Sequence, residues 1–249
     1  MLDFNQKAGV LRKTTLVDYP GHVACAFFLS GCNLKCPYCY NTGLVLSPTQ
    51  EDLDNFSTIQ ELFDLMDKRS AVIQGVAISG GEPLINQYTP AIIEKAKKMG
   101  LHVKIDTNGI NPEILERFMN EESLRPDFVA MDLKTSPARY ATEMIGENYL
   151  HFGDADFFEE KIRHTIKILS QMPPESREFR TVLVPHLVEE TDIKTMGELL
   201  PKDASWQFAP FRNENCIDPR YNRITPYSIT QEEALVDYAR TFIQGAKLR

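Results

Sequence analysis

The chain alternates between short apolar runs and amphipathic stretches along nearly its whole length, and this alternation is what most constrains its fold. Apolar and aromatic runs bounded by Gly or Pro predict buried strands. These strands are expected at residues 23–29, 75–79, 102–106, 128–132, 179–184 and 206–209. Apolar residues at helical spacing predict helices at residues 58–68, 90–99, from 112 onward, 157–169, 191–200 and 231–242. Gly100 follows one of these helices, as a C-terminal glycine would.

Six predicted strands separated by helices imply parallel β-α-β units with right-handed crossovers. Six strands are fewer than the eight of a closed barrel, so an α/β fold with an open, partial barrel or with a doubly wound sheet is expected. The 249 residues contain no repeat, low-complexity tract or evident linker. We therefore predict a single domain over residues 1–249, with a core at 13–211 and a C-terminal helical segment at 230–243.

Composition excludes several classes of protein. Lys and Arg number 27 against 35 Asp and Glu, which gives a net charge of −8 and argues against nucleic-acid binding as the main task. No stretch approaches the roughly 18 apolar residues that cross a bilayer, and no signal-peptide pattern opens the sequence. Five cysteines, an odd number with three of them clustered, fit a reducing compartment. We expect a cytoplasmic protein with neither a membrane nor a nucleic-acid partner.

The three clustered cysteines are Cys32, Cys36 and Cys39, separated by gaps of three and then two residues. A structural zinc site or an ordinary iron–sulfur cluster takes four protein ligands, but the next cysteine is Cys216. Structural thiols, or zinc completed by a histidine, are the alternatives; His22 is the only histidine nearby. The spacing favours an iron–sulfur cluster with one metal position left for a ligand that the protein does not supply.

Polar residues occur where the predicted strands end, and parallel strands bring their carboxyl ends to one edge. The candidates at these ends are Gly80, Gly81, Glu82, Asp106, Thr107, Asp132 and Lys134, and Arg180 is a further candidate within the fifth predicted strand. Simpler explanations remain open for them. Paired glycines mark tight turns, aspartates cap helices, and basic residues form ion pairs or solvated rims. The same holds for Tyr38, which could simply pack, and for Cys25 and Cys216, which we expect to be buried apolar groups.

The cysteine spacing, with Tyr38 directly before Cys39, resembles the signature of the radical S-adenosylmethionine (radical SAM) enzymes. The resemblance implies a partial (β/α)₆ barrel, a [4Fe–4S] cluster on Cys32, Cys36 and Cys39, and SAM bound to the open iron. It also implies reductive cleavage of SAM to a 5′-deoxyadenosyl radical that abstracts hydrogen. The stretch Gly80-Gly81-Glu82-Pro83 is similar to the family's glycine-rich segment, whose backbone contacts the methionyl amine of SAM.

A narrower resemblance covers residues 15–21, 78–83, 104–109, 129–134 and 178–185. These segments resemble the activating proteins of glycyl radical enzymes, most of all those of anaerobic ribonucleoside-triphosphate reductase. The resemblance implies a glycyl radical enzyme as partner and a flavodoxin- or ferredoxin-like electron donor. It also implies a SAM site lined by Tyr38, Gly80, Gly81, Glu82, Asp106, Thr107, Asp132, Lys134 and Arg180. A monovalent cation is implied near Asp106 and Asp132.

One position departs from the pattern of the activating proteins, which usually carry histidine directly after the third cysteine. Here Tyr40 stands at that place, and it cannot titrate near neutral pH. No further cysteine precedes the second predicted strand, so we expect one cluster only. Two other functions stay open: a radical SAM enzyme acting directly on a small molecule, peptide or nucleobase, and a metal-stabilised binding module without enzymatic activity.

Overall fold

The computed structural model describes residues 2–145 and 154–249, and its chain forms two compact units. The first unit comprises Met1–Asn33, Asn41–Thr107 and Glu113–Val129, and the second comprises Leu34–Tyr40, Asn108–Pro112 and Ala130–Arg249. The single domain expected over residues 1–249 stays a prediction, and its residues 1 and 146–153 lie outside the described ranges.

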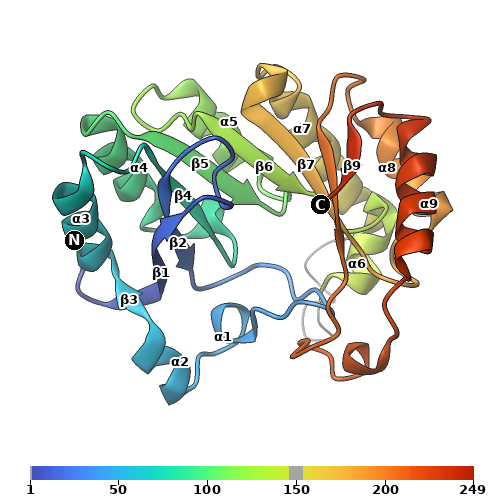
Figure 1. Cartoon of the computed structure of the whole chain (residues 1–249), viewed down its shortest axis with the longest axis horizontal. Helices are drawn as coiled ribbons and strands as arrows, with labels where there is room; N and C mark the ends of the chain where they lie inside the picture. Colours follow the sequence, from blue (N-terminus) through green and yellow to red (C-terminus); the bar gives the residue numbers. More distant parts are fainter. Residues whose placement is uncertain (1, 146–153) are drawn as a thin grey trace. The chain divides into compact units, whose positions relative to one another are not determined.

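The first unit contains a mixed sheet with the strand order β3-β1-β2-β4-β5 (Figure 1). Its strands are β1 (Lys7–Thr15), β2 (Ala24–Leu29), β3 (Ser57–Thr58), β4 (Gly75–Gly80) and β5 (His102–Thr107). β1 pairs antiparallel with β2 and β3, whereas β2, β4 and β5 run parallel. The helices are α1 (Thr42–Val45), α2 (Gln50–Asn55), α3 (Ile59–Arg69), α4 (Thr89–Lys98) and nearly all of α5 (Pro112–Asn120). Every residue of β2 except Phe28 is buried, as is typical of a parallel strand covered on both faces.

The second unit is built around the parallel strands β7 (Arg177–Leu183), β8 (Trp206–Pro210) and β9 (Ala246–Leu248), in that order. Strand β6 (Phe128–Asp132) begins in the first unit and ends in the second. The helices are α6 (Tyr140–Glu143), α7 (Ala155–Leu169), α8 (Glu190–Leu199) and α9 (Ile229–Arg240). Helix α9 packs beside α8 and β9 (Figure 1). The core includes Trp206, whose indole N–H donates to the Thr181 hydroxyl at 3.0 Å, so the buried ring leaves no polar atom unpaired.

The six predicted strands are all present, and each begins and ends within two residues of the predicted bounds. The predicted helices agree equally well because their ends carry clear signals. Thr58 and Glu61 form a capping box at the start of α3, and Lys68 and Arg69 lie in its last turn. Gly100 has φ +73° directly after the end of α4, which confirms its predicted role.

Strand β1 was not predicted. Two lysines and an arginine among its nine residues obscure the apolar signal, although both of its edges are paired. Gly9 allows the pairing with β2, since a Cβ there would lie 2.0 Å from the carbonyl oxygen of Phe28. The sequence patterns also missed the short elements β3, β9, α1, α2 and α6.

Candidate active site

The loop that follows β2 carries the three clustered cysteines. None of the three is in a disulfide bond; Cys36 is buried, and Cys32 and Cys39 are half-buried. Cys25 and Cys216 are buried, as predicted for small apolar groups. In the described ranges, no three or more Cys, His, Asp or Glu side chains are gathered closely enough to hold a metal ion. The assignment of Cys32, Cys36 and Cys39 as cluster ligands therefore rests on the sequence motif.

The part of this loop in the second unit is held by backbone hydrogen bonds from a distant segment. The N–H groups of Ile217 and Asp218 donate to the carbonyls of Cys39 and Pro37, each at 2.9 Å. These bonds fix the chain on both sides of the third cysteine. No sequence pattern indicated that residues near 217 would lie against the cysteine loop.

Tyr38 and Tyr40 differ in exposure. Tyr38 is buried, and its ring meets that of Phe211 edge-on at 6.5 Å between centroids. Burial raises the pKa of Tyr38 well above its ordinary value, while the nearby Lys134 acts in the opposite direction. Tyr38 thus packs within the second unit, as the simpler explanation held. Tyr40, at the position where the activating proteins usually have histidine, is 59% exposed.

The glycine-rich stretch at the end of β4 lies against the start of the cysteine loop. The N–H of Gly81 donates to the carbonyl of Leu29 at 2.7 Å, and the N–H of Glu82 donates to that of Gly31 at 2.8 Å. A Cβ on Gly81 would lie 2.0 Å from the Gly31 oxygen, and Gly80 has φ +109°. Both glycines are therefore required by the backbone, and they lie beside the residue that precedes Cys32.

Glu82 and Thr107, two predicted site residues from different strands, are in direct contact. Both are buried, and the Thr107 hydroxyl donates to Glu82 Oε1 at 2.9 Å. The same carboxylate oxygen accepts from the N–H of Leu84 at 3.1 Å, at the start of the short 3₁₀ helix Pro83–Ile85. Glu82 thus joins the carboxyl ends of β4 and β5.

Asp106 is held by two side chains of the first unit. The Ser79 hydroxyl donates to its Oδ2 at 2.7 Å, and the ammonium of Lys104 forms an ion pair with its Oδ1. Lys104 is 2% exposed, and its Nζ lies 5.9 Å from the ring centroid of Phe128. Asp106 does not cap a helix, because α5 begins only at Pro112. Sequence reasoning missed Lys104, although a charged residue inside a predicted buried strand was a usable signal.

Asp132 in the second unit also has two cationic partners. Arg180 Nε donates to its Oδ1 at 2.7 Å, and Lys134 Nζ donates to its Oδ2 at 3.3 Å. Burial acts to lower the pKa of Lys134, but the Asp132 carboxylate and the neighbouring acidic groups together hold that pKa above its ordinary value. The thiol of Cys36 and the phenol of Tyr38 add to the same rise, so these groups are close to the lysine. Lys134 and Arg180 thus both form ion pairs with Asp132, and their predicted place at a SAM site stays a prediction.

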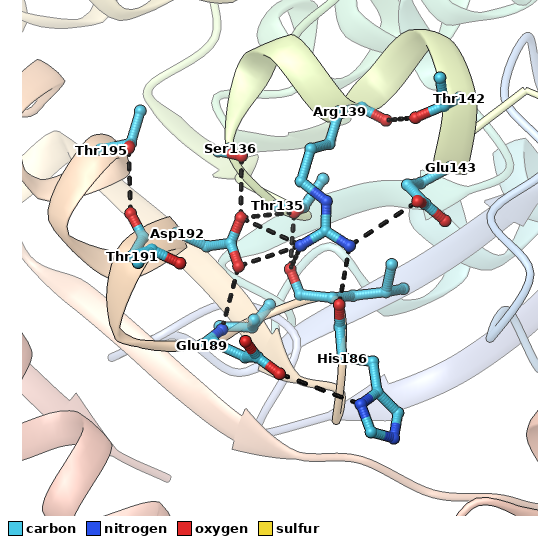
Figure 2. A network of polar contacts seen from close by, with 12 residues as sticks. Thr135, Ser136, Arg139, Thr142, Glu143, His186, Glu189, Thr191, Asp192 and Thr195 are labelled. Atoms are coloured by element: carbon cyan, nitrogen blue, oxygen red, sulfur yellow. Dashed lines mark hydrogen bonds and ion pairs between the residues drawn. The ribbon is translucent and has the colours of Figure 1, made fainter.

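A buried network, which sequence reasoning missed, fixes the loop after β6 (Figure 2). Asp192, at the start of α8, is 4% exposed and accepts from the Ser136 hydroxyl at 2.8 Å and from Arg139 Nη1 at 3.1 and 3.2 Å. The Thr135 hydroxyl donates to the Leu187 carbonyl at 2.6 Å. The network therefore ties the residues that follow Lys134 to the turn before α8.

Helix α6 connects this network to the backbone of Lys134 and to the cysteine loop. It begins beside Arg139, and the Tyr140 hydroxyl accepts the Lys134 N–H at 2.9 Å. At the other end of the helix, the carbonyl of Met144 accepts the N–H of Lys35 at 2.9 Å. The cysteine loop and the Lys134 backbone are thus both bound to one short helix, which the Asp192 network holds in place.

The model of the radical SAM superfamily matches residues 27–197 of the chain. The matched range covers the cysteine loop and the residues at the ends of β4, β5 and β6. The chain therefore belongs to the radical SAM superfamily, whose enzymes use SAM and a [4Fe–4S] cluster.

Relatives with curated names include activating proteins. The chain is 28% identical over 248 residues to a protein of Methanocaldococcus jannaschii that carries the provisional name glycyl-radical enzyme activating enzyme. This match covers 97% of the present chain and 95% of the relative. Over 91 residues the chain is 34% identical to the anaerobic ribonucleoside-triphosphate reductase-activating protein of Escherichia coli, covering 34% of this chain and 53% of that one.

Among solved structures, the chain resembles SuiB of Streptococcus suis bound to S-adenosylmethionine, with a TM-score of 0.58 and 15% identity. The match covers 88% of this chain and 47% of SuiB, and it concerns the fold alone. Together with the family match it confirms the predicted α/β fold of the radical SAM type, a partial barrel. None of the described helices is long and apolar enough to cross a membrane.

Proposed function

We propose that this chain cleaves SAM reductively at a [4Fe–4S] cluster and uses the resulting radical to generate a glycyl radical on a partner enzyme. The observation that supports this most is the likeness to the M. jannaschii protein, which extends over nearly the whole of both chains. The partner we propose is an anaerobic ribonucleoside-triphosphate reductase, the enzyme given in the name of the E. coli relative.

The number and spacing of the cysteines support a cluster of this kind. Cys32, Cys36 and Cys39 lie in one short loop outside any disulfide bond, and three thiolates would leave one iron for the amino and carboxylate groups of SAM. When bound, the cluster supplies the single electron that cleaves SAM to methionine and the 5′-deoxyadenosyl radical. The protein's own part is to bind and orient SAM and to exclude water and oxygen.

The charged residues of the second unit suit an anionic group of SAM. Asp132 is paired with two cations, Lys134 and Arg180. We propose that these two cations also bind the carboxylate of SAM.

The glycine-rich stretch suits the methionyl ammonium. The N–H groups of Gly81 and Glu82 already donate to Leu29 and Gly31, so the carbonyls of Gly80 and Gly81 are the groups that would accept from the ammonium. We propose that Asp106 and Thr107 of the same unit also take part in binding SAM, with the Glu82 carboxylate holding the Thr107 hydroxyl in position.

The test is to mix the reconstituted, oxygen-free chain with the host's anaerobic reductase, SAM and a flavodoxin- or ferredoxin-like electron donor. The expected result is a glycyl radical signal on the reductase by electron paramagnetic resonance. C36A should abolish the signal, and the matched control C25A should keep it because Cys25 is buried in β2. SAM cleavage without a glycyl radical would refute the proposed partner and favour direct action on a small molecule, peptide or nucleobase.

We also propose that the protein works in a reducing compartment, the cytoplasm. None of the described cysteines is in a disulfide bond, as is usual in a compartment that keeps thiols reduced.

A further inference from the structure

The two aspartates at which the resemblance implies a monovalent cation are each already paired with a cation of the chain itself. In the first unit, the Oδ1 of Asp106 is paired with the ammonium of Lys104, and its Oδ2 accepts from the Ser79 hydroxyl at 2.7 Å. Both carboxylate oxygens of Asp106 therefore have a donor before any metal ion is considered.

The burial of Lys104 makes this pair hard to separate. Its side chain is only 2% exposed, and burying an ammonium at such a place is unfavourable unless an opposite charge compensates it. The ring of Phe128, 5.9 Å away, adds a weaker attraction. A metal ion that displaced Lys104 from Asp106 would leave a buried positive charge without its carboxylate, beside a second cation.

The second aspartate is satisfied in the same way within its own unit. The Oδ1 of Asp132 accepts a hydrogen bond from Arg180 Nε at 2.7 Å, and its Oδ2 accepts one from Lys134 Nζ at 3.3 Å. Both carboxylate oxygens of Asp132 thus already have a cationic donor, and a metal ion bound there would be repelled by the positive charges of Arg180 and Lys134. The residues present do not fit a monovalent metal ion at either aspartate.

We propose that the Lys104 ammonium is a built-in cation in place of the monovalent metal ion, so that this chain binds SAM without Na⁺ or K⁺. Lys104 neutralises Asp106 and thereby removes the repulsion between that carboxylate and the carboxylate of SAM. Lys104 is thus a positioning residue. The SAM part of this inference rests on the proposed function, whereas the cation part concerns the free chain alone.

The first measurement needs neither SAM nor a cluster. The free chain is titrated with Tl⁺, which stands in for K⁺, and followed by thallium NMR. Its melting temperature is compared in KCl and in tetramethylammonium chloride of equal ionic strength. We expect no saturable Tl⁺ binding and equal melting temperatures. Saturable Tl⁺ binding that K⁺ displaces would overturn the proposal.

The second measurement uses K104M, which keeps a long apolar side chain but removes the charge. In tetramethylammonium buffer the dissociation constant for SAM, measured on the reconstituted protein, should rise by about tenfold relative to the unsubstituted chain. Addition of K⁺ or Na⁺ should restore the affinity and give saturable Tl⁺ binding, because Asp106 is then open to a metal ion. The control K95M removes a lysine that pairs with Asp67 at the surface, and it should show neither effect.

The proposal about Lys104 and the proposed function would be refuted by different results. If the unsubstituted chain loses SAM affinity in tetramethylammonium buffer, or if K104M binds SAM equally well in both salts, Lys104 does not act as the cation. If no variant binds SAM in any buffer, the proposed function is wrong, and the Tl⁺ titration of the free chain still decides the cation question. The same titration decides it if K104M does not fold.

Discussion

Replacement of Asp192 by alanine tests whether the network in Figure 2 holds the second unit together. The carboxylate accepts from the Ser136 hydroxyl at 2.8 Å, from Arg139 at 3.1 Å and from the N–H of Glu189 at 3.1 Å. Alanine removes these bonds and leaves the guanidinium with only the more distant carboxylate of Glu143, 3.7 Å from its Nη2.

The expected loss in the free energy of unfolding follows from the burial of this ion pair. Breaking a buried ion pair by removing one partner costs about 3–5 kcal/mol. Asp192 is 5% exposed at its side chain, but Arg139 is 33% exposed, so water compensates part of the loss. We expect a destabilisation of about 3 kcal/mol, which corresponds to a fall in melting temperature of about 6–12 °C for a chain of this size.

The assay is thermal unfolding of the cluster-free chain followed by circular dichroism. The matched control is E198A on the same helix, which removes the exposed partner of Lys194 and should shift the free energy of unfolding by less than about 0.5 kcal/mol. A fall for D192A no larger than that for E198A would refute the account of this network.

Three further predictions concern single side chains. G81A should lower both the melting temperature and the affinity for SAM, because its Cβ would lie 2.0 Å from the Gly31 oxygen; a variant that binds SAM normally would contradict this. Y140F should cost about 1–3 kcal/mol in urea unfolding, since the N–H of Lys134 loses its acceptor; an unchanged midpoint would count against it. Burial raises the pKa of Glu232, so its contribution to stability is present at low pH and lost as the pH rises through the raised value. E232Q should therefore raise the melting temperature near pH 7 and not near pH 4, and equal shifts at both pH values would show that burial does not act on the charge.

The sequence predicted the fold well for those elements whose burial leaves a local pattern of apolar residues. Strands such as β2 and β4 are continuous apolar runs because both of their faces are covered, and such runs are visible in the sequence. β1 was missed because a strand with lysine and arginine among its residues lacks that run, and β9 because three residues are too few. The alternation of strands and helices therefore indicated the class of fold, but it did not reveal strands that are charged or very short, such as β1 and β9.

The contacts among the candidate residues were predicted in part. Some of the predicted residues in each unit are in contact: Glu82 contacts Thr107 in the first, and Arg180 and Lys134 contact Asp132 in the second. The partners that hold these residues were not found from the sequence. Asp192 lies 56 residues from Ser136 along the chain, and a hydrogen bond over such a separation leaves no local pattern in the sequence. The hydrogen bonds from Ile217 and Asp218 to the cysteine loop were hidden for the same reason.

The most direct test of the central claim is the electron paramagnetic resonance spectrum of the reduced protein, reconstituted without oxygen, recorded before and after addition of SAM. The account predicts about four iron and four sulfide per chain and a cluster spectrum that changes when SAM binds the open iron. It also predicts that C36A loses the cluster while C25A retains it. A protein that holds zinc instead, or a cluster whose spectrum SAM leaves unchanged, would contradict the account.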